Sequence, residues 1–318
     1  MTYCSDFETE FVDYAIEQTH PFVRDCAGGN LRSNLLEVVR LHLQWITSAE
    51  FAQSHSSGHQ CFGAPTAAFN NRLIQIGPLR FLAGIRFRNL DSRHPFVTID
   101  QSSQPIGALD DCAGLMSTMR GAFSIFKPRA LSFHHPSHLP LRFQGAVADF
   151  HVLIASAQAM AAAPAPSGLE RVTLVSSTHL DFYERYVALY DDIYNERPWA
   201  RSEVRVEDRE SLAGCCSEGL LFHVQVDGIW SGIIAGTHWG RAAGGAVKGV
   251  QIAEIVLAKS ARGMGLGVAV QHRFAEQIAT RDPKMTVWGT IAHANVPMLR
   301  TAERAGRINV GTTYCSDF

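Results

Sequence analysis

The feature that most constrains the fold of this 318-residue chain is an apolar strand that runs into a glycine-rich turn and then a helix. The segment reads Glu254-Ile-Val-Leu257-Ala-Lys-Ser-Ala-Arg262-Gly263-Met-Gly265-Leu-Gly267. Glycine lets a ligand approach the backbone where a bulky side chain would keep it away. The amides at a helix N-terminus lack partners and lie at the positive end of the helix dipole. The segment therefore predicts a phosphate-binding turn, to which Arg262 adds a permanent charge.

Three interpretations of this turn compete. An ordinary glycine-rich strand-to-helix turn needs no ligand. A dinucleotide fold fails in detail, because the glycines are spaced G-x-G-x-G and too little chain follows to complete a Rossmann sheet. In the third interpretation the turn resembles that of the GNAT N-acetyltransferase family, whose signature R/Q-x-x-G-x-G/A opens the helix after the fourth strand. Arg262, Gly265 and Gly267 match this signature in place.

The sequence on both sides of the turn is similar to the same family. Downstream, an apolar strand over 286–291 leads to Asn295 and to a short helix that ends at Gly306. Upstream, Asp227-Gly228 joins two apolar runs as a two-residue hairpin, similar to the family's second and third strands. The resemblance extends from about Leu169 to the end of the chain. It implies an α/β fold with a mixed sheet packed by helices.

The resemblance also implies a co-substrate, acetyl-CoA or another acyl-CoA, between the fourth and fifth strands, and no metal. Its pantetheine would pair with the backbone near Val256 and Leu257, and its pyrophosphate would lie on the turn. The amine attacks the thioester directly, and a backbone N–H of the fourth strand stabilises the oxyanion. The residues implied at the cofactor are Val256, Leu257, Arg262, Gly263, Met264, Gly265, Leu266, Gly267 and Asn295.

Two proton transfers need side chains. An alkyl amine, with a pKa of about 10.4, must lose a proton, and Glu254 is the candidate base. The alternative is a strand carboxylate that faces solvent or an arginine, because a bulge changes where strand side chains point. For the departing thiolate, many family members use a tyrosine seven residues after the asparagine, where this chain has Ala302. Either the thiolate leaves unassisted or another group, with His293 as candidate, protonates it.

The chain is expected to form two domains, over 1–160 and 169–318, joined by the linker M-A-A-A-P-A-P-S-G at 160–168. In the first domain, strands over 80–88 and 96–100, a helix over 109–123 and a strand over 130–133 loosely mirror the second. The first domain is then either a degenerate GNAT-like copy or an unrelated α/β domain. As a copy it should not bind CoA, since its turn at 102–107 lacks the arginine and the paired glycines.

Together these features predict an acyl-CoA-dependent N-acyltransferase acting on an amine of a small molecule or peptide. The spacing of Tyr186 with Phe182 and Leu189 predicts a core residue, whereas other aromatic residues such as Tyr190 are either core or the lining of an acceptor pocket. The alternative is a catalytically inactive acyl-CoA-binding or protein-interaction module with the same fold, which the missing tyrosine at Ala302 favours. The first domain would shape substrate access or assembly, with a homodimer as one assembly.

Composition excludes other classes of partner. The net charge of −2 argues against nucleic acid, and no apolar run reaches the roughly 20 residues that span a bilayer. The start of the chain is not a basic-then-apolar secretory signal, and the seven cysteines form no C-x-x-C pair, so we expect a cytoplasmic protein.

The histidines near 55–59 and 134–138 are expected to be solvated loop residues rather than metal ligands. The repeat T-Y-C-S-D-F at 2–7 and 313–318 predicts two similar edge strands or reflects the origin of the sequence.

Overall fold

The computed structural model describes residues 5–109, 112–238 and 242–318, which divide into two compact units. Unit 1 takes in the described residues up to Phe150, together with 243–246 and 310–318. Unit 2 takes in the described residues of 151–242 and 247–309. No helix among the described residues is long and apolar enough to cross a membrane.

Unit 2 is built on a mixed sheet whose strands lie in the order β5-β10-β9-β8-β7-β6. The pairs β6–β7, β7–β8 and β8–β9 are antiparallel, whereas β9 and β10 are parallel. This confirms the predicted mixed α/β class. The strands are β5 Val147–Ser156, β6 Val172–Ser176, β7 Leu221–Val226, β8 Ile229–Thr237, β9 Val247–Leu257 and β10 Thr286–Ala292.

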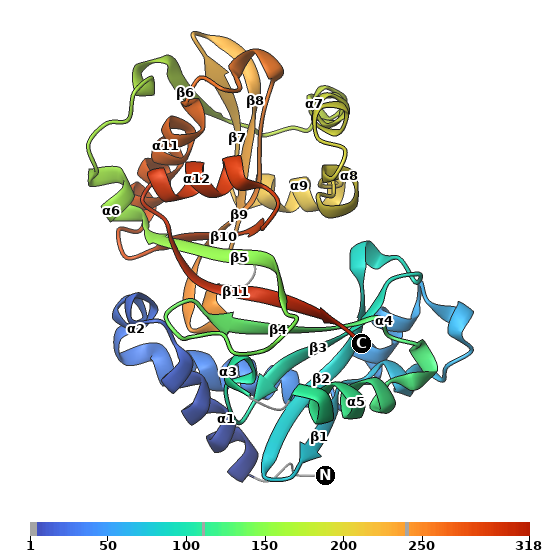
Figure 1. Ribbon diagram of the computed structural model, residues 1–318. Helices are drawn as coiled ribbons and strands as arrows, with labels where there is room; N and C mark the ends of the chain where they lie inside the picture. The colour runs from blue at the N-terminus through green and yellow to red at the C-terminus, as the bar shows by residue number, and fades with distance from the viewer. Residues whose placement is uncertain (1–4, 110–111, 239–241) are drawn as a thin grey trace. The chain divides into compact units, whose positions relative to one another are not determined.

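Helices cover both faces of this sheet. Figure 1 shows α11 and α12 on one face and α7 and α9 on the other. α11 buries Val270, Phe274 and other apolar residues against β7, β8 and β9, and α7 packs Tyr186 and Tyr190 on the opposite face. The helices are α6 Ala157–Ala162, α7 Tyr183–Glu196, α8 Ala200–Glu203, α9 Arg209–Ser217, α11 Leu266–Arg281 and α12 Val296–Arg304.

Unit 1 has the strand order β1-β2-β3-β4-β11, with β3 and β4 parallel and the other pairs antiparallel. The strands are β1 Arg72–Ile76, β2 Leu79–Phe87, β3 Pro95–Ser102, β4 Ala130–Pro136 and β11 Ile308–Asp317. The helices are α1 Ser5–Gln18, α2 Pro21–Ala27, α3 Leu31–Gln44, α4 Ala49–Ser56, α5 Cys112–Ala122 and the short α10 Ala242–Gly245. Single 3-10 turns of unit 1 lie at Gly28–Asn30, Gln60–Phe62, Thr66–Phe69, Arg88–Leu90, Ile106–Ala108 and Ser124–Phe126, and those of unit 2 lie at Leu169–Arg171 and Lys259–Ala261.

The two units repeat one topology. In unit 1 the run is β1-β2-β3, α5 and a parallel β4, and in unit 2 it is β7-β8-β9, α11 and a parallel β10. Both third strands carry an irregularity against the preceding strand, at Asp100 in β3 and at Ala253 in β9. Because strand order, helix position and bulge all recur, the first half is a second copy of the same arrangement.

The division into units differs from the division expected from the linker. β11 follows unit 2 in sequence, yet it pairs antiparallel with β4 and completes the sheet of unit 1. β5 precedes the linker, and its residues from His151 on lie in unit 2, beside β10. The expected linker is also shorter, since Met160 belongs to α6 and is 2% exposed. The last strand of the first half of the chain, β5, therefore lies mostly in unit 2, and the last strand of the second half, β11, lies mostly in unit 1.

The expectations of two similar edge strands, one of the alternatives for the terminal repeat, and of solvated histidines were wrong. The second copy of the terminal repeat lies in and just after β11, but residues 5–7 of the first copy begin α1, and residues 1–4 lie outside the described ones. The histidines are not all solvated: His135 is a buried residue of β4, and His59 is buried with its ring 3.7 Å from that of Phe87. Among the described residues, no group of histidine, cysteine or acidic side chains is arranged to hold a metal.

Candidate active site

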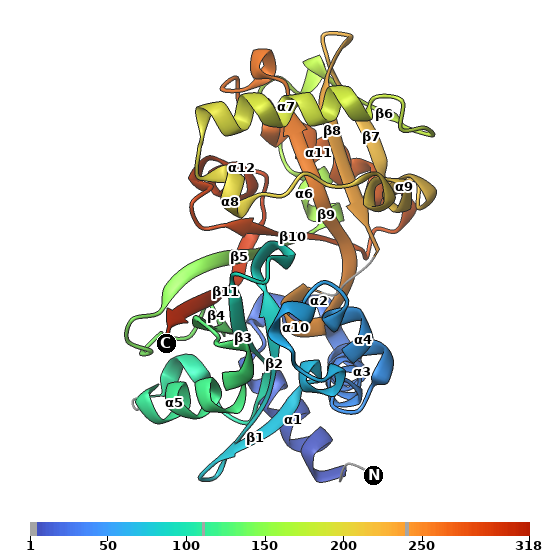
Figure 2. The ribbon, with the colours of Figure 1, turned by 90° about the vertical axis from the view of Figure 1, so that its right-hand side faces the viewer.

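The parallel strands β9 and β10 pair only at their beginnings. Their register runs from Thr286↔Gly249 to Trp288↔Gln251 and stops there, although both strands continue. Beyond this point the strands diverge (Figure 2). The backbone of β9 from Ile252 onward is therefore left without a partner strand on its β10 side, where the family resemblance places an acyl-CoA.

A bulge in β9 decides where Glu254 points. Ala235 pairs with Glu254 and Gly236 with Ile252, so Ala253 is an extra residue in the ladder. Side chains along a regular strand alternate between faces, so Ile252 and Glu254 would otherwise share one. With the bulge, Ile252 packs in the core beneath α11, whereas Glu254 contacts the tyrosines of α7.

Glu254 is a buried carboxyl held by two phenols. Tyr186 Oη donates to Glu254 Oε2 at 2.6 Å and Tyr190 Oη donates to the same oxygen at 2.5 Å. The Glu254 side chain is 7% exposed. Burial raises the pKa of Glu254 to about 6, against the opposing effect of the two tyrosine hydrogen bonds. A carboxyl with this pKa takes up and releases a proton near neutral pH, which suits a general base.

The tyrosine hydroxyls are expected to tune this base. Tyr190→Phe removes a donor to the ionised carboxylate, and a hydrogen bond to a charged group contributes about 1.5 kcal/mol or more, so the pKa of Glu254 should rise by about one unit. The measurement is the pKa of Glu254 by carboxyl-carbon NMR titration. Tyr183→Phe is the matched control, because Tyr183 donates to the carbonyl of Glu207 instead. An unchanged pKa in Tyr190→Phe would contradict the hydrogen-bonded arrangement.

The glycine-rich turn is open as a cradle for a ligand. Gly263 and Gly265 have φ of +74° and +75°, and a Cβ at either position would meet no atom within 4 Å. Within the described residues, the amides of 263–267 donate no hydrogen bond. Gly265 caps α11, so these amides point from the positive end of a 16-residue helix. That the turn binds phosphate stays a prediction.

Arg262 and Gly267 have structural contacts that sequence reasoning missed. Arg262 donates to the carbonyl of Leu257 at 2.8 Å, to Glu196 at 2.9 Å and to the carbonyl of Leu189 at 3.3 Å, so it ties the turn to α7. A Cβ at Gly267 would lie 2.9 Å from Thr301 Cγ2, so this glycine permits α12 to approach α11. Their roles toward a ligand stay predictions.

The other predicted cofactor residues lie around the same strands. Asn295 is the N-cap residue of α12, and its buried Oδ1 has no hydrogen-bond partner. Val256 and Leu266 are 4% and 1% exposed, so their side chains belong to the cores on the two faces and only their backbones are available to a ligand. Met264 is 47% exposed at the tip of the turn.

His293 is placed apart from Glu254. It follows β10, is exposed, and its Nδ1 lies 2.9 Å from His151 Nε2, while His151 Nδ1 lies 3.1 Å from Asn309 Nδ2. Burial, and then the neighbouring His293, lower the pKa of His151. The two predicted catalytic residues are thus bonded to different partners, Glu254 to tyrosines and His293 to a histidine. A proton-transfer role for His293 stays a prediction.

Unpartnered buried polar atoms gather around the diverging strands. Within the described part of unit 2 they all lie on α11, β10, α12 and the residue before β11. Such atoms are uncommon in folded proteins unless a ligand or water satisfies them. They are Gln271 Oε1, Trp288 Nε1, Asn295 Oδ1, and Nε and Nη2 of Arg307. Arg307 drew no attention in the sequence, where a lone arginine before a strand carries no signal.

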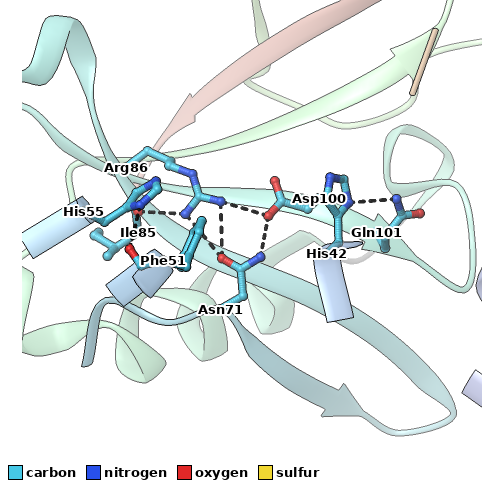
Figure 3. Close-up of polar contacts among 8 residues, drawn as sticks. All are labelled: His42, Phe51, His55, Asn71, Ile85, Arg86, Asp100 and Gln101. Atoms are coloured by element: carbon cyan, nitrogen blue, oxygen red, sulfur yellow. Dashed lines mark hydrogen bonds and ion pairs between the residues drawn. The ribbon is translucent and has the colours of Figure 1, made fainter. Parts of the chain in front are cut away.

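In unit 1 the equivalent positions are occupied by an internal network (Figure 3). Gln101 follows the bulge as Glu254 does, but it is an amide whose Nε2 lies 3.0 Å from His42 Nδ1. The bulge residue Asp100 accepts from Arg86 at 3.0 Å and from Asn71 at 2.7 Å. The carboxylate of this bulge is therefore paired with an arginine, unlike Glu254 in unit 2.

The cavity between β3 and β4 of unit 1 is small. A cavity of about 150 Å³ lies where these strands part, lined among others by Tyr14, Asp100 and His134. Sites for drug-sized ligands begin at about 300 Å³. The ring of His135 occupies the space next to Gly107, whose carbonyl accepts from the amide of Phe143 at 3.1 Å. That the first half does not bind CoA stays a prediction.

Comparison with known proteins gives likenesses of fold only. No family model matches the chain, and no curated protein matches it significantly. Among solved structures, it is similar to a GCN5-related N-acetyltransferase from Sphaerobacter thermophilus, with a TM-score of 0.48 at 13% identity over 77% of this chain and 82% of that one. It is also similar to one from Kribbella flavida, with a TM-score of 0.42 at 17% identity over 85% and 95%.

A tandem GNAT protein from the clavulanic acid biosynthesis pathway is similar as well, with a TM-score of 0.45 at 15% identity over 78% of this chain and 82% of that one. At TM-scores this low, no residue of this chain is assigned a role by its match in the other proteins. The resemblance to GNAT acetyltransferases therefore depends on the turn, the bulge and the diverging strands of unit 2 themselves.

Proposed function

We propose that the chain is an acyl-CoA-dependent N-acyltransferase whose site lies in unit 2, with acetyl-CoA as the default donor. The observation that carries the proposal is Glu254: a bulge turns this buried carboxyl toward two tyrosines, beside the point where β9 and β10 diverge. A strand carboxylate that served only solubility would face water.

The residues present fit an acyl-CoA. The open glycine turn offers unbonded amides to a pyrophosphate, and the free side of β9 offers backbone groups to the amides of a pantetheine. The unpartnered Oδ1 of Asn295 lies at the start of α12, on the next element of the same site. When bound, the acyl-CoA supplies an activated acyl group.

The residues of unit 2 would then act on the amine. Glu254 Oε2 accepts a proton from the attacking nitrogen, while Tyr186 and Tyr190 hold the carboxylate in place. The backbone of β9 beyond Ile252 can donate to the developing oxyanion. The acceptor is proposed as an amine of a small molecule or peptide.

The pH dependence follows from the state of Glu254. A base must be ionised, so kcat/KM should rise with pH up to about 6 and fall about tenfold per unit below it, since the pKa of Glu254 is about 6. The measurement is the rate of thiol release from acetyl-CoA between pH 5 and 8. A flat profile through pH 6 would show that another group is the base.

The competing function is an acyl-CoA-binding or protein-interaction module without catalysis. It is favoured by Ala302, which is fully buried against Leu153 and Ile291 and offers no hydroxyl where many family members have tyrosine. The deciding experiment incubates the full chain with acetyl-CoA and a panel of amines and peptides, and measures free thiol and amide product together. Binding of acetyl-CoA without product from any acceptor favours the module.

A further inference from the structure

Arg307 is a buried cation that forms no ion pair with any of the described residues. It lies between Gly306 and β11, its side chain is 2% exposed, and its Nε and Nη2 make no hydrogen bond. A Cβ at Gly289 would lie 3.2 Å from Arg307 Nη1 and 3.3 Å from the carbonyl oxygen of Ile252. Gly289 directly follows Trp288, the last residue of β10 that pairs with β9. The guanidinium therefore lies at the vertex where the two strands diverge.

The face of the sheet on which Arg307 lies follows from the alternation of β10. Val287 packs in the core beneath α11, and Ile291 packs against Ala302 of α12. Gly289 lies between them in sequence and so presents to the same face. Arg307 thus shares this face with the glycine turn and α12, whereas Glu254 and its tyrosines lie on the α7 face.

A buried arginine without a partner raises the free energy of the folded protein. This points to an anion that pairs with it and that is absent from the resting protein. Removing a charge from water without a partner costs several kcal/mol. Burial accordingly lowers the pKa of Arg307, to about 10, so the group still carries its charge at neutral pH. The anion must arise on the face opposite the base.

We infer that Arg307 is a catalytic residue that neutralises the negative charge on the departing CoA sulfur, in place of a proton donor. The inference rests on the proposed function. In the transfer, the amine nitrogen forms a bond to the thioester carbon, the carbon–sulfur bond breaks, and its electron pair stays on sulfur as a thiolate. The amine proton goes to Glu254, and Arg307 pairs with the thiolate until solvent protonates it.

The position of Ala302 supports this role. At the position where many family members have a tyrosine, this chain has Ala302, whose side chain is a methyl group. The backbone amide of Arg307 donates to the carbonyl of Ala302 at 3.0 Å. The backbone of the cation is thereby tied to the residue at which the proton donor is missing, while its guanidinium lies by Gly289 of β10. A cation beside a thiol lowers its pKa from about 8.5 to between about 3.5 and 7.5, so the thiolate becomes the stable form.

The test measures protons released when free CoA binds. Calorimetry in two buffers of different ionisation enthalpy should show proton release when CoA binds the full chain at pH 7, because the bound thiol ionises: about a quarter of a proton per CoA if its pKa is about 7.5, and nearly one if its pKa is about 6 or lower. Arg307→Met should bind CoA without releasing a proton, and Arg307→Lys, which keeps a charge, should restore much of the release. Arg304→Met, an exposed arginine of α12, is the matched control and should behave as wild type.

The kinetic and stability readouts are independent of calorimetry. Arg307→Met should lower kcat about 10²-fold, the usual loss on removing one electrostatic contact to a developing charge. Its melting temperature should be higher than that of wild type, because an unpaired charge is removed. A lower melting temperature would show that the arginine has stabilising partners and would overturn the inference.

Three further outcomes separate the possible failures. If wild type binds CoA and acetyl-CoA but releases no proton, Arg307 has no such role while the proposed function stands. If neither ligand binds, both fail. Malonyl-CoA could instead bind at least about tenfold tighter than acetyl-CoA in wild type but not in Arg307→Met. The arginine would then bind a carboxylate of the acyl group, and the thiolate role would be overturned.

Discussion

Glu254→Gln is expected to lower kcat about 10³-fold and to leave the affinity for acetyl-CoA within about threefold of wild type. Glutamine keeps the size of the side chain and one oxygen to accept from Tyr186 or Tyr190, so the fold is preserved. It cannot take a proton from the amine. Because acyl-CoA is expected to contact the backbone of β9 rather than this carboxyl, the loss should appear in kcat and not in binding.

Steady-state kinetics of thiol release, with calorimetry of acetyl-CoA, measures both effects. Glu170→Gln is the matched control, because Glu170 is an exposed carboxyl of the same unit. The acid limb near pH 6 should also disappear in Glu254→Gln. A variant that retains more than about a tenth of wild-type kcat would remove Glu254 from the role of base.

Charge at the glycine turn is expected to have the second large effect. Gly265→Asp should bind acetyl-CoA at least about 30-fold more weakly than Gly265→Asn, since placing a carboxylate near the phosphates costs about 2 kcal/mol or more. Both side chains tolerate positive φ and have the same shape, and the Cβ meets no atom within 4 Å. The comparison therefore isolates charge from backbone strain.

Calorimetric titration of acetyl-CoA into the two variants provides the measurement, with their melting temperatures as a check on folding. Equal affinities for Asp and Asn at position 265 would mean that the phosphates lie elsewhere. A loss of binding in both would indicate that the conformation of the turn, rather than its charge, is critical.

Local patterns predicted the elements of unit 2 well. The hairpin at Asp227-Gly228 forms with φ of +50° and +78°, as its two residues favour, and the apolar period of α11 gives the observed helix. The spacing of the glycines was sufficient to predict the turn, because backbone conformation and the access of a ligand to the backbone are local properties. The predictions were weakest where pairing is non-local.

The exchange of β5 and β11 could not be predicted, because strand order depends on contacts between residues far apart in the chain. The same limit applies to the terminal repeat, where residues 5–7 begin a helix and 313–317 belong to a strand. Tertiary surroundings override local preference in short segments.

The candidate site was predicted in part. Glu254 was found from its place on the strand, but its direction depended on the extra residue Ala253, which no sequence pattern marks. The tyrosines of α7 were noted as aromatic residues, and only the structure places two of their hydroxyls on one carboxylate oxygen. Arg307 is identified by what it lacks, namely solvent and a partner.

The central claim is that unit 2 binds an acyl-CoA and unit 1 does not. Calorimetric titration of acetyl-CoA into the full chain tests it most directly through the stoichiometry. One molecule bound per chain is the predicted result, because the turn at Gly263–Gly267 is open while the corresponding turn of unit 1, at 102–107, lacks the arginine and the paired glycines. No binding would contradict the proposed function, and two molecules per chain would contradict the assignment of the site to unit 2 alone.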